Sequence, residues 1–111
     1  MIHVNVSQSK EENRILHIMI MGHAGFGQPG EDIVCAAVSA LAIGTLNSTE
    51  RLLGIDLKPI SDEKDGGVLA WNIPKVDDPI LDEQLQLLMK ALVESLKMIE
   101  EEYHEFIQVN V

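Results

Sequence analysis

The chain has 111 residues, enough for one domain with a modest core, and we treat residues 1–111 as a single domain. A hydrophobic content of 46% argues against disorder, and a net charge of −10 argues against direct nucleic-acid binding, which needs clustered Lys and Arg. The same charge is compatible with attraction of a basic partner, although solubility is the simpler interpretation.

The sequence also bears on the compartment in which the protein works. Cys35 is the single cysteine, so no internal disulfide can form and nothing points to an oxidising environment. The N-terminal run MIHVNVSQSK alternates apolar and polar residues and lacks the apolar core of a secretory signal. We find no apolar run long enough to cross a bilayer and expect no membrane association. A cytoplasmic location is the resulting expectation.

Two runs near the N-terminus predict an antiparallel hairpin joined by the polar turn SQSKEEN. In IHVNV, Ile2, Val4 and Val6 share one face, as the period of two predicts for a strand. The second run, RILHIMIMG, is apolar on both faces, which indicates a central strand. One face of this second run should carry Ile15, Met19 and Met21, and the other Leu16, Ile18 and Ile20.

A glycine-rich segment, GHAGFGQPG, follows at residues 22–30 and predicts a loop. The period then changes to that of a helix, from about Glu31 to Gly54. Two acidic residues in its first turn suit the helix dipole, and Gly54 is a plausible stop. Gly44, inside the helix, costs about 1 kcal/mol relative to Ala. The alanines around it predict close packing against a sheet or a second helix.

The second half of the chain predicts another hairpin, a helix and a last strand. The runs IDLKPI and VLAWNIP flank the turn-rich SDEKDGG and should pair. In the run DDPILDEQLQLLMKALVESLKMIEEEY, Asp78 can cap a helix that has Pro79 at its first position. Its apolar stripe comprises Leu81, Leu85, Leu88, Leu92, Leu96, Ile99 and Tyr103. The last strand, EFIQVNV, should place Ile107, Val109 and Val111 on one face.

The predicted element order is therefore ββαββαβ. Such an order indicates an α+β domain in which a small mixed β-sheet has two helices packed against it. The order of the strands within the sheet does not follow from the pattern.

The strongest chemical signal is a histidine and a cysteine on either side of the glycine-rich segment. The thiolate is the reactive form of cysteine, and an ordinary thiol titrates near pH 8.5. Cys35 falls near the start of the predicted helix, where the dipole favours an anion, and the loop could fold His23 over it. An imidazolium there would stabilise the thiolate and later protonate a leaving amine. The competing interpretation is a buried structural cysteine, since free Cys is often a core residue.

Two further polar residues lie within one helical turn of Cys35. Asp32, three residues earlier, would raise the pKa of the thiol if it touched the sulfur, or orient His23 if it bonded to the far ring nitrogen. Ser39, four residues later, could bond a substrate or a loop. Its simplest expectation is a bond back to the carbonyl oxygen of Cys35.

Other site chemistries fit the sequence poorly. The glycines of residues 22–30 do not form a phosphate loop, because the spacing is wrong and no Lys follows. A zinc site needs several ligands at close spacing, and the histidines are scattered along the chain. We therefore expect no metal and no cofactor.

The run GHAGFGQPGEDIVCAAVSAL resembles the signature of the ribosomal-processing cysteine proteases, the Prp family. The matching positions are Gly22, His23, Asp32, Cys35 and Ser39. The length and element order of the whole chain are also similar to those of the family. The run DGGVLAWNIP before an acidic, leucine-rich helix adds a less specific match.

The resemblance implies a thiol peptidase in which His23 and Cys35 form the catalytic pair. Gly22, Asp32 and Ser39 would then support the pair or position the substrate. The implied reaction removes a short N-terminal extension from the large-subunit ribosomal protein L-twenty-seven, between an aromatic and a small residue. The resemblance also implies a homodimer and a loop that moves when substrate binds. The loop residues concerned are Gly25, Phe26, Gly27 and Gly30.

Two other functions remain open from the sequence. The first is a non-catalytic, acidic and dimeric ribosome-assembly factor that binds a basic partner and keeps Cys35 as a structural residue. The second is a thiol-based redox sensor, which would have to act between molecules because the chain has no resolving cysteine. Reaction of the folded protein with iodoacetamide at neutral pH separates a nucleophile from a core cysteine.

Overall fold

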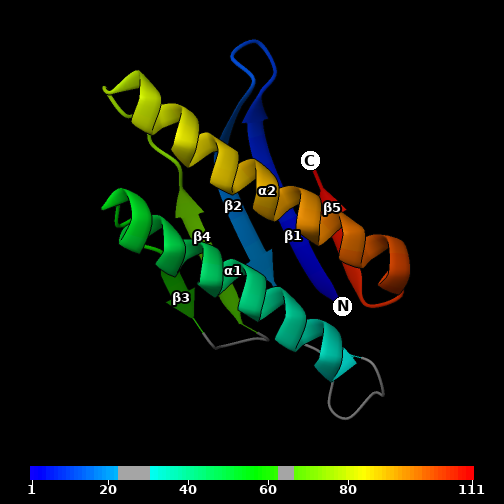
Figure 1. Cartoon of the computed structure of the whole chain (residues 1–111). Coiled ribbons are helices and arrows are strands. Elements are labelled where there is room, and N and C mark those ends of the chain that lie inside the picture. Colours follow the sequence, from blue (N-terminus) through cyan, green and yellow to red (C-terminus); the bar gives the residue numbers. More distant parts are fainter. Residues whose placement is uncertain (23–30, 63–66) are drawn as a thin grey trace.

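The chain folds into one sheet with a layer of helices against it (Figure 1). The computed structural model describes residues 1–22, 31–62 and 67–111. Within these ranges the elements follow the predicted ββαββαβ order, and the α+β class is confirmed. The strands are β1 (Ile2–Ser9), β2 (Arg14–Met21), β3 (Ile60–Asp62), β4 (Val68–Asn72) and β5 (Ile107–Asn110). The helices are α1 (Glu31–Leu53) and α2 (Pro79–Tyr103).

The described strands are arranged in the order β3-β4-β2-β1-β5, so that β2 is central, as its two apolar faces predict. The pairs β1–β2, β2–β4 and β3–β4 are antiparallel, which confirms both predicted hairpins. Strand β5 instead runs parallel to β1. The sheet is therefore mixed, and its edges are β3 and β5.

The β1–β2 ladder contains a bulge that reverses the faces at the start of β2. Ser7 pairs with His17 but Gln8 pairs with Ile15, so the register skips Leu16. Ile15 is consequently 4% exposed, whereas Leu16 is 43% exposed. The predicted grouping of Ile15 with the two methionines of β2 is wrong, because an added residue shifts the alternation by one position.

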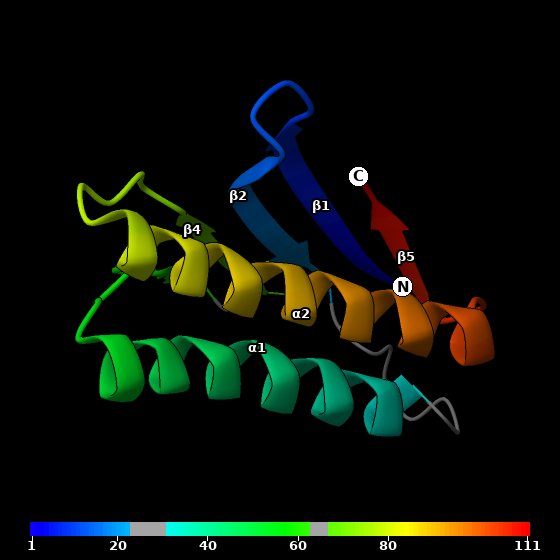
Figure 2. The ribbon, with the colours of Figure 1, turned by 45° about the horizontal axis from the view of Figure 1, so that its top comes forward.

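Both helices lie on one face of the sheet and run side by side (Figures 1 and 2). The core lies between this layer and the sheet, and it includes Ile2, Val4 and Val6 of β1 on one face, as predicted. Each large aliphatic side chain that is fully buried here contributes roughly 1.5–3 kcal/mol. From the helices the core receives Val34, Val38 and Ala42 of α1, and Leu85, Met89, Leu92, Val93 and Leu96 of α2.

The start of α2 follows the predicted capping pattern. Asp78 has an extended backbone conformation, and its Oδ1 accepts hydrogen bonds from the N–H groups of Ile80 and Leu81 at 2.9 and 3.4 Å. Pro79 is the first helical residue. The predicted stripe is correct at its centre, but Tyr103, at the end of the helix, is 42% exposed.

Helix α1 ends where the sequence predicts, but Gly44 has a different setting. Gly54 has a φ of +69°, and its N–H donates to the carbonyl oxygen of Glu50 at 2.9 Å. A Cβ atom added to Gly44 would meet nothing within 4 Å. The expected close packing at Gly44 is therefore wrong, because Gly44 lines a hollow between α1 and α2, opposite Leu88 and Leu92, and no side chain fills it at this position.

The stretch Ile33–Leu53 of α1, 21 residues long, is long and apolar enough by length and composition to cross a membrane. The expectation that no run has this property was wrong. Ser39, Gly44 and Thr45 interrupt the apolar residues, but they do not make the stretch strongly polar. The core helix of a soluble protein can pass the same test.

Strand β3 is shorter than the predicted run IDLKPI. The N–H of Lys58 donates to Oδ1 of Asp56 at 2.9 Å, and Lys58 has a φ of +51°. This local turn and Pro59, which has no N–H, keep the chain out of the sheet until Ile60. In the last strand, Ile107 is 1% exposed, whereas Val111 lies beyond the strand and is 55% exposed.

A polar network ties the start of β2 to the first turns of α2. The Arg14 guanidinium donates to both carboxylate oxygens of Asp82, at 2.5 and 2.9 Å, and Gln86 exchanges two hydrogen bonds with the backbone of Ile15. Asp82 also accepts the N–H of Val76 at 3.0 Å. The bonds from Arg14 and then from Val76 lower the pKa of Asp82 to about 2.

Candidate active site

Cys35 lies at the boundary between the core and the outside. It is the fifth residue of α1, its side chain is half-buried, and it packs against the core cluster. Val34 and Val38 beside it are 1% and 3% exposed and hold this face of the helix against the sheet. Cys35 is therefore fixed in place without being enclosed, a setting that suits a functional thiol better than a core residue.

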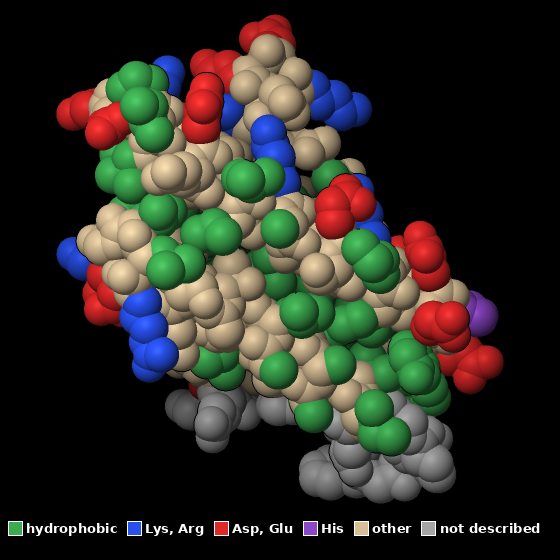
Figure 3. All heavy atoms as spheres, in the orientation of Figure 1, with side chains coloured by type: hydrophobic (Ala, Val, Ile, Leu, Met, Phe, Trp, Pro, Cys, Tyr) green, Lys and Arg blue, Asp and Glu red, His purple; other side chains and the backbone are tan. Residues whose placement is uncertain are grey.

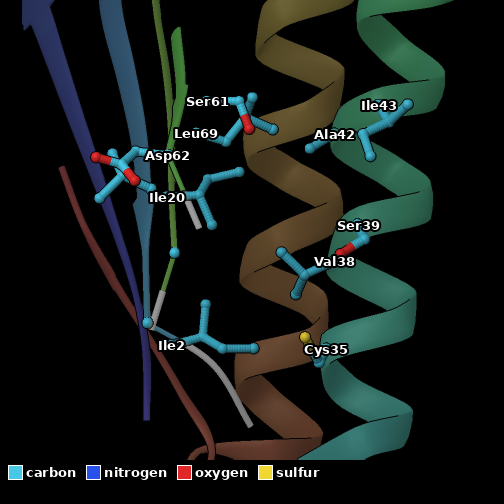
Figure 4. Close-up of a pocket in the computed structure, with 13 residues that line it drawn as sticks. Ile2, Ile20, Cys35, Val38, Ser39, Ala42, Ile43, Ser61, Asp62 and Leu69 are labelled. Carbon is cyan, nitrogen blue, oxygen red and sulfur yellow. The ribbon is translucent and has the colours of Figure 1, made fainter. Parts of the chain in front are cut away.

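A cavity of about 180 Å³ lies between α1 and the sheet, and Cys35 lines it at one end (Figure 4). Ile43, two helical turns later, lies toward the other end. Most of the lining is apolar, so burial of an apolar ligand group would be favourable. On the helix side this lining includes Val38, Ala42 and Ile43, and on the sheet side Ile2, Ile20 and Leu69.

Ser39 also lines the cavity, one helical turn after Cys35. Its expected bond back to the Cys35 carbonyl oxygen stays a prediction. Thr45 and Thr49 on the same helix form such bonds, to the carbonyl oxygens four residues earlier, at 2.6 and 2.7 Å. Ser39 is exposed on the cavity wall, where its hydroxyl can reach a ligand.

Glycine is required at position 22 for a structural reason that the sequence did not reveal: Gly22 must adopt a positive φ in a confined space. Its φ is +91°, and an added Cβ would collide with the carbonyl oxygen of Met1. Its N–H donates to the carbonyl oxygen of Gly67 at 3.1 Å, which continues the β2–β4 ladder past the ends of both strands. Gly22 lines the cavity and is required here by conformation and space together.

The other predicted site residues fall in the parts of the chain that the structure does not describe. His23, Gly25, Phe26, Gly27 and Gly30 lie outside the described residues, and so does the side chain of Asp32. Their predicted roles stay predictions. The structure brings together Gly22, Cys35 and Ser39 on one cavity.

Sequence reasoning missed the sheet side of the cavity. Ser61 and Leu69 line it and are paired across β3 and β4, but they lie about thirty residues from Cys35 in the chain. Only the strand order, which the pattern does not give, places β3 and β4 opposite this part of α1. Within residues 1–22, 31–62 and 67–111, no group of three or more His, Cys, Asp and Glu side chains is placed to hold a metal ion.

Fold and site together define a small α+β protein with a single thiol on the wall of an apolar cavity. The family described as Cysteine protease Prp matches residues 1–108. The chain belongs to this family, and its class of activity is that of a cysteine protease.

Relatives and solved structures agree with this assignment. The Ribosomal processing cysteine protease Prp of Bacillus subtilis is 34% identical over 110 residues, which span 98% of this chain and 96% of that protein. The crystal structure of SMU.848 from Streptococcus mutans has a TM-score of 0.87 at 32% identity, covering 99% and 92% of the two chains. A Staphylococcus aureus Prp in complex with a substrate peptide has a TM-score of 0.78 at 32% identity, covering 99% and 98%. Another S. aureus Prp structure, with a covalently linked product peptide, has a TM-score of 0.73 at 31% identity, with the same coverage.

Proposed function

We propose that this protein is an endopeptidase that removes the N-terminal extension of a basic large-subunit ribosomal protein of the L-twenty-seven type. The observation that carries the proposal is the position of Cys35 on the wall of an apolar cavity that is open to a ligand. A covalently linked product peptide in a structure of similar fold supports a covalent step on the enzyme.

The proposed mechanism uses the Cys35 thiolate as nucleophile and His23 as acid and base. The sulfur attacks the scissile carbonyl carbon, and protonated His23 donates its proton to the leaving amine. A thioester to Cys35 remains, and neutral His23 then takes a proton from water as the water attacks this thioester. The new carboxylate leaves and the thiolate is restored. Ser39 can contribute a hydrogen bond to the substrate from its place on the cavity wall.

Charge supports the choice of a basic substrate. The chain has 18 acidic and 8 basic residues, and acidic side chains gather along the rim of the face that carries the helices (Figure 3). Long-range attraction would speed encounter with a basic ribosomal protein. Ribosome assembly takes place in the cytoplasm, which agrees with the compartment expected for this chain.

We also infer a homodimer. Large apolar side chains are exposed on both helices, including Ile33 at 67%, Leu52 at 73% and Leu87 at 66%. Burial of such side chains between two copies would be favourable. Light scattering coupled to size-exclusion chromatography measures the molar mass, and a monomer at micromolar concentration would contradict this inference.

Incubation with the candidate ribosomal protein, followed by intact-mass measurement, tests the activity. The wild-type protein should remove an N-terminal segment. Cys35→Ala and Cys35→Ser should be inactive, and His23→Ala should lower turnover about 10²–10⁴-fold. The exposed His104, at the end of α2, offers a matched control: His104→Ala should cleave normally.

The rate of cleavage should also fall as ionic strength rises, since salt screens the attraction. An unchanged substrate mass with folded protein, or wild-type turnover by Cys35→Ala, would overturn the proposal. Binding of the ribosomal protein without cleavage, together with a thiol inert to iodoacetamide, would favour the non-catalytic assembly factor.

A further inference from the structure

The two edges of the sheet differ in what satisfies their outward backbone groups. At the β5 edge, α2 reaches over the strand, and Oε2 of Glu100 accepts the N–H of Val109 at 2.6 Å. The β3 edge lies beside the cavity that holds Cys35, and all three residues of β3 are exposed. An edge strand with outward N–H and C=O groups is a template for pairing with another extended chain.

The ladder register shows which residue of β3 faces outward. The N–H of Gly22 donates to the carbonyl oxygen of Gly67, and the N–H of Ile73 donates to that of Leu16. Every second residue from Gly67 to Ile73 therefore directs its backbone N–H and C=O toward β2. The residues between them direct these groups toward β3, where Val68 pairs with Asp62 and Ala70 pairs with Ile60.

The remaining β3 residue, Ser61, directs its backbone N–H and C=O away from β4, toward the open side of the strand. Pro59 would direct an N–H the same way but has none. Within the described part of β3, Ser61 thus provides the outward donor. A short edge strand next to a proline also protects a sheet against unwanted pairing. The position of the cavity distinguishes a binding edge from one that is merely protected.

Ser61 pairs with Leu69, and both residues line the cavity on the side of the sheet that faces α1 (Figure 4). Side chains of directly paired residues lie on the same face of a sheet. A residue that paired with Ser61 from outside would therefore point its side chain toward α1, where Ala42 and Ile43 form the apolar wall.

The distance to the thiol suits an extended chain. Cys35 and Ile43 are eight residues apart on α1, which corresponds to about 12 Å at 1.5 Å per residue. An extended chain covers this length in about four residues at 3.3 Å each. A segment held at Ser61 can thus reach Cys35 without folding back.

We propose that β3 is a docking strand, on which an extended segment of the substrate pairs with the backbone of Ser61 and places one large apolar side chain in the cavity. This inference rests on the proposed peptidase function and adds its substrate class: an unfolded segment with an apolar residue about four positions from the scissile bond. Backbone pairing supplies affinity and the pocket supplies selectivity.

Two variants separate the backbone of Ser61 from its side chain. Ser61→Ala removes only the hydroxyl, whereas Ser61→Pro also removes the outward N–H and places a ring on the edge. The probe is a synthetic peptide that spans the extension and the first mature residues of the candidate ribosomal protein. The specificity constant kcat/KM of Ser61→Pro should be at least about tenfold below that of Ser61→Ala, chiefly through KM. Both variants should be alkylated at Cys35 by iodoacetamide at the same rate.

A series of peptides, each N-methylated at one backbone nitrogen, tests the same pairing from the substrate side. One position should lose at least about tenfold in binding, and its neighbours should tolerate the methyl group. Binding of this series is also measured on Cys35→Ala, so the edge is tested even if the wild type cleaves no peptide. Absence of cleavage would contradict the peptidase proposal and not the docking strand. Equal kcat/KM for the two Ser61 variants, or a uniform response to methylation, would overturn the docking strand. If Ser61→Pro does not fold, the methylated series decides.

Discussion

At Gly22, both the backbone conformation and the lack of space exclude a Cβ atom. Its φ of +91° is unfavourable for any residue with a Cβ, and that Cβ would overlap the Met1 carbonyl oxygen. We expect Gly22→Ala to lower the free energy of unfolding by about 3 kcal/mol or more, the sum of strain and overlap. Urea denaturation measures this loss.

Gly54 is the matched control for this substitution. Its φ is +69°, but a Cβ added there would meet nothing within 4 Å, so only the conformational cost of about 1–2 kcal/mol applies to Gly54→Ala. A loss at Gly22 no larger than the loss at Gly54 would show that the contact with Met1 is unimportant.

Single residues differ in how far the sequence could predict their setting. The place of Cys35 near a helix start follows from the change of period after residue 30, and Asp78 follows from its spacing to Pro79. The place of Ser39 on a cavity wall does not follow from the sequence, because the opposite wall comes from β3 and β4, which are distant in the chain.

Among the elements, α1 carries a residue that weakens it without a visible compensation. Gly44 lies in the interior of the helix, is exposed, and has open space around its Cα. We expect Gly44→Ala to raise the free energy of unfolding by about 0.5–1 kcal/mol, since alanine restricts the unfolded chain and favours the helix. Thermal and urea unfolding measure the gain.

Ala40→Gly, one turn earlier on the same exposed side, should produce a loss of similar size and serves as the reverse control. If Gly44→Ala is destabilising, or if it changes the molar mass in solution, a second chain must lie against this part of α1.

Element prediction succeeded where one period continues and failed where a single residue interrupts it. The alternation of β1 and the capped start of α2 appear in the structure as predicted. The bulge at Leu16 is invisible in the pattern, because both faces of β2 are apolar and a shift by one position leaves the hydrophobicity unchanged. The turn at Asp56 and Lys58 shortens β3 through a side-chain bond that the apolar pattern does not show.

For the whole molecule, the bond between Arg14 and Asp82 links stability to pH. The pKa of Asp82 is lowered from 3.8 to about 2, so the folded state holds this carboxyl ionised in a range where the unfolded chain protonates it. Its contribution is complete above the unfolded value and is lost as the pH falls through about 2. We expect the free energy of unfolding to decrease between about pH 5 and pH 2.

Asp82→Asn should flatten this acid limb and should also destabilise the protein at neutral pH, because Arg14 then loses its ionised partner. Asp78→Asn, on the same helix, keeps a good N-cap and leaves the pair of Arg14 and Asp82 in place, so it should retain the acid limb that this pair produces. Identical acid limbs for wild type and Asp82→Asn would contradict the assignment. Urea titrations at each pH provide the measurement.

The overall arrangement was the least accessible to sequence reasoning. The α+β class and the element order follow from the alternation of periods, but the parallel pairing of β1 with β5 joins the two ends of the chain. Residues such as Cys35, Ser61 and Leu69 meet on one cavity only because of this long-range order. Local patterns carry no information about which distant strands are neighbours.

The hydrogen bond from Val109 to Glu100 also limits how copies of this protein can polymerise. A fibril that grows by edge-to-edge addition needs two receptive edges on every subunit, so that each new subunit exposes another growing end. Here the outward N–H of Val109 at the β5 edge is engaged by its own helix, whereas the outward N–H of Ser61 at the β3 edge remains directed away from the sheet. Two copies that met at β3 would use up both of these donors, so pairing of strand edges alone would stop at two copies. The protein can thus keep one edge open for an extended chain without a sheet that extends strand by strand from copy to copy.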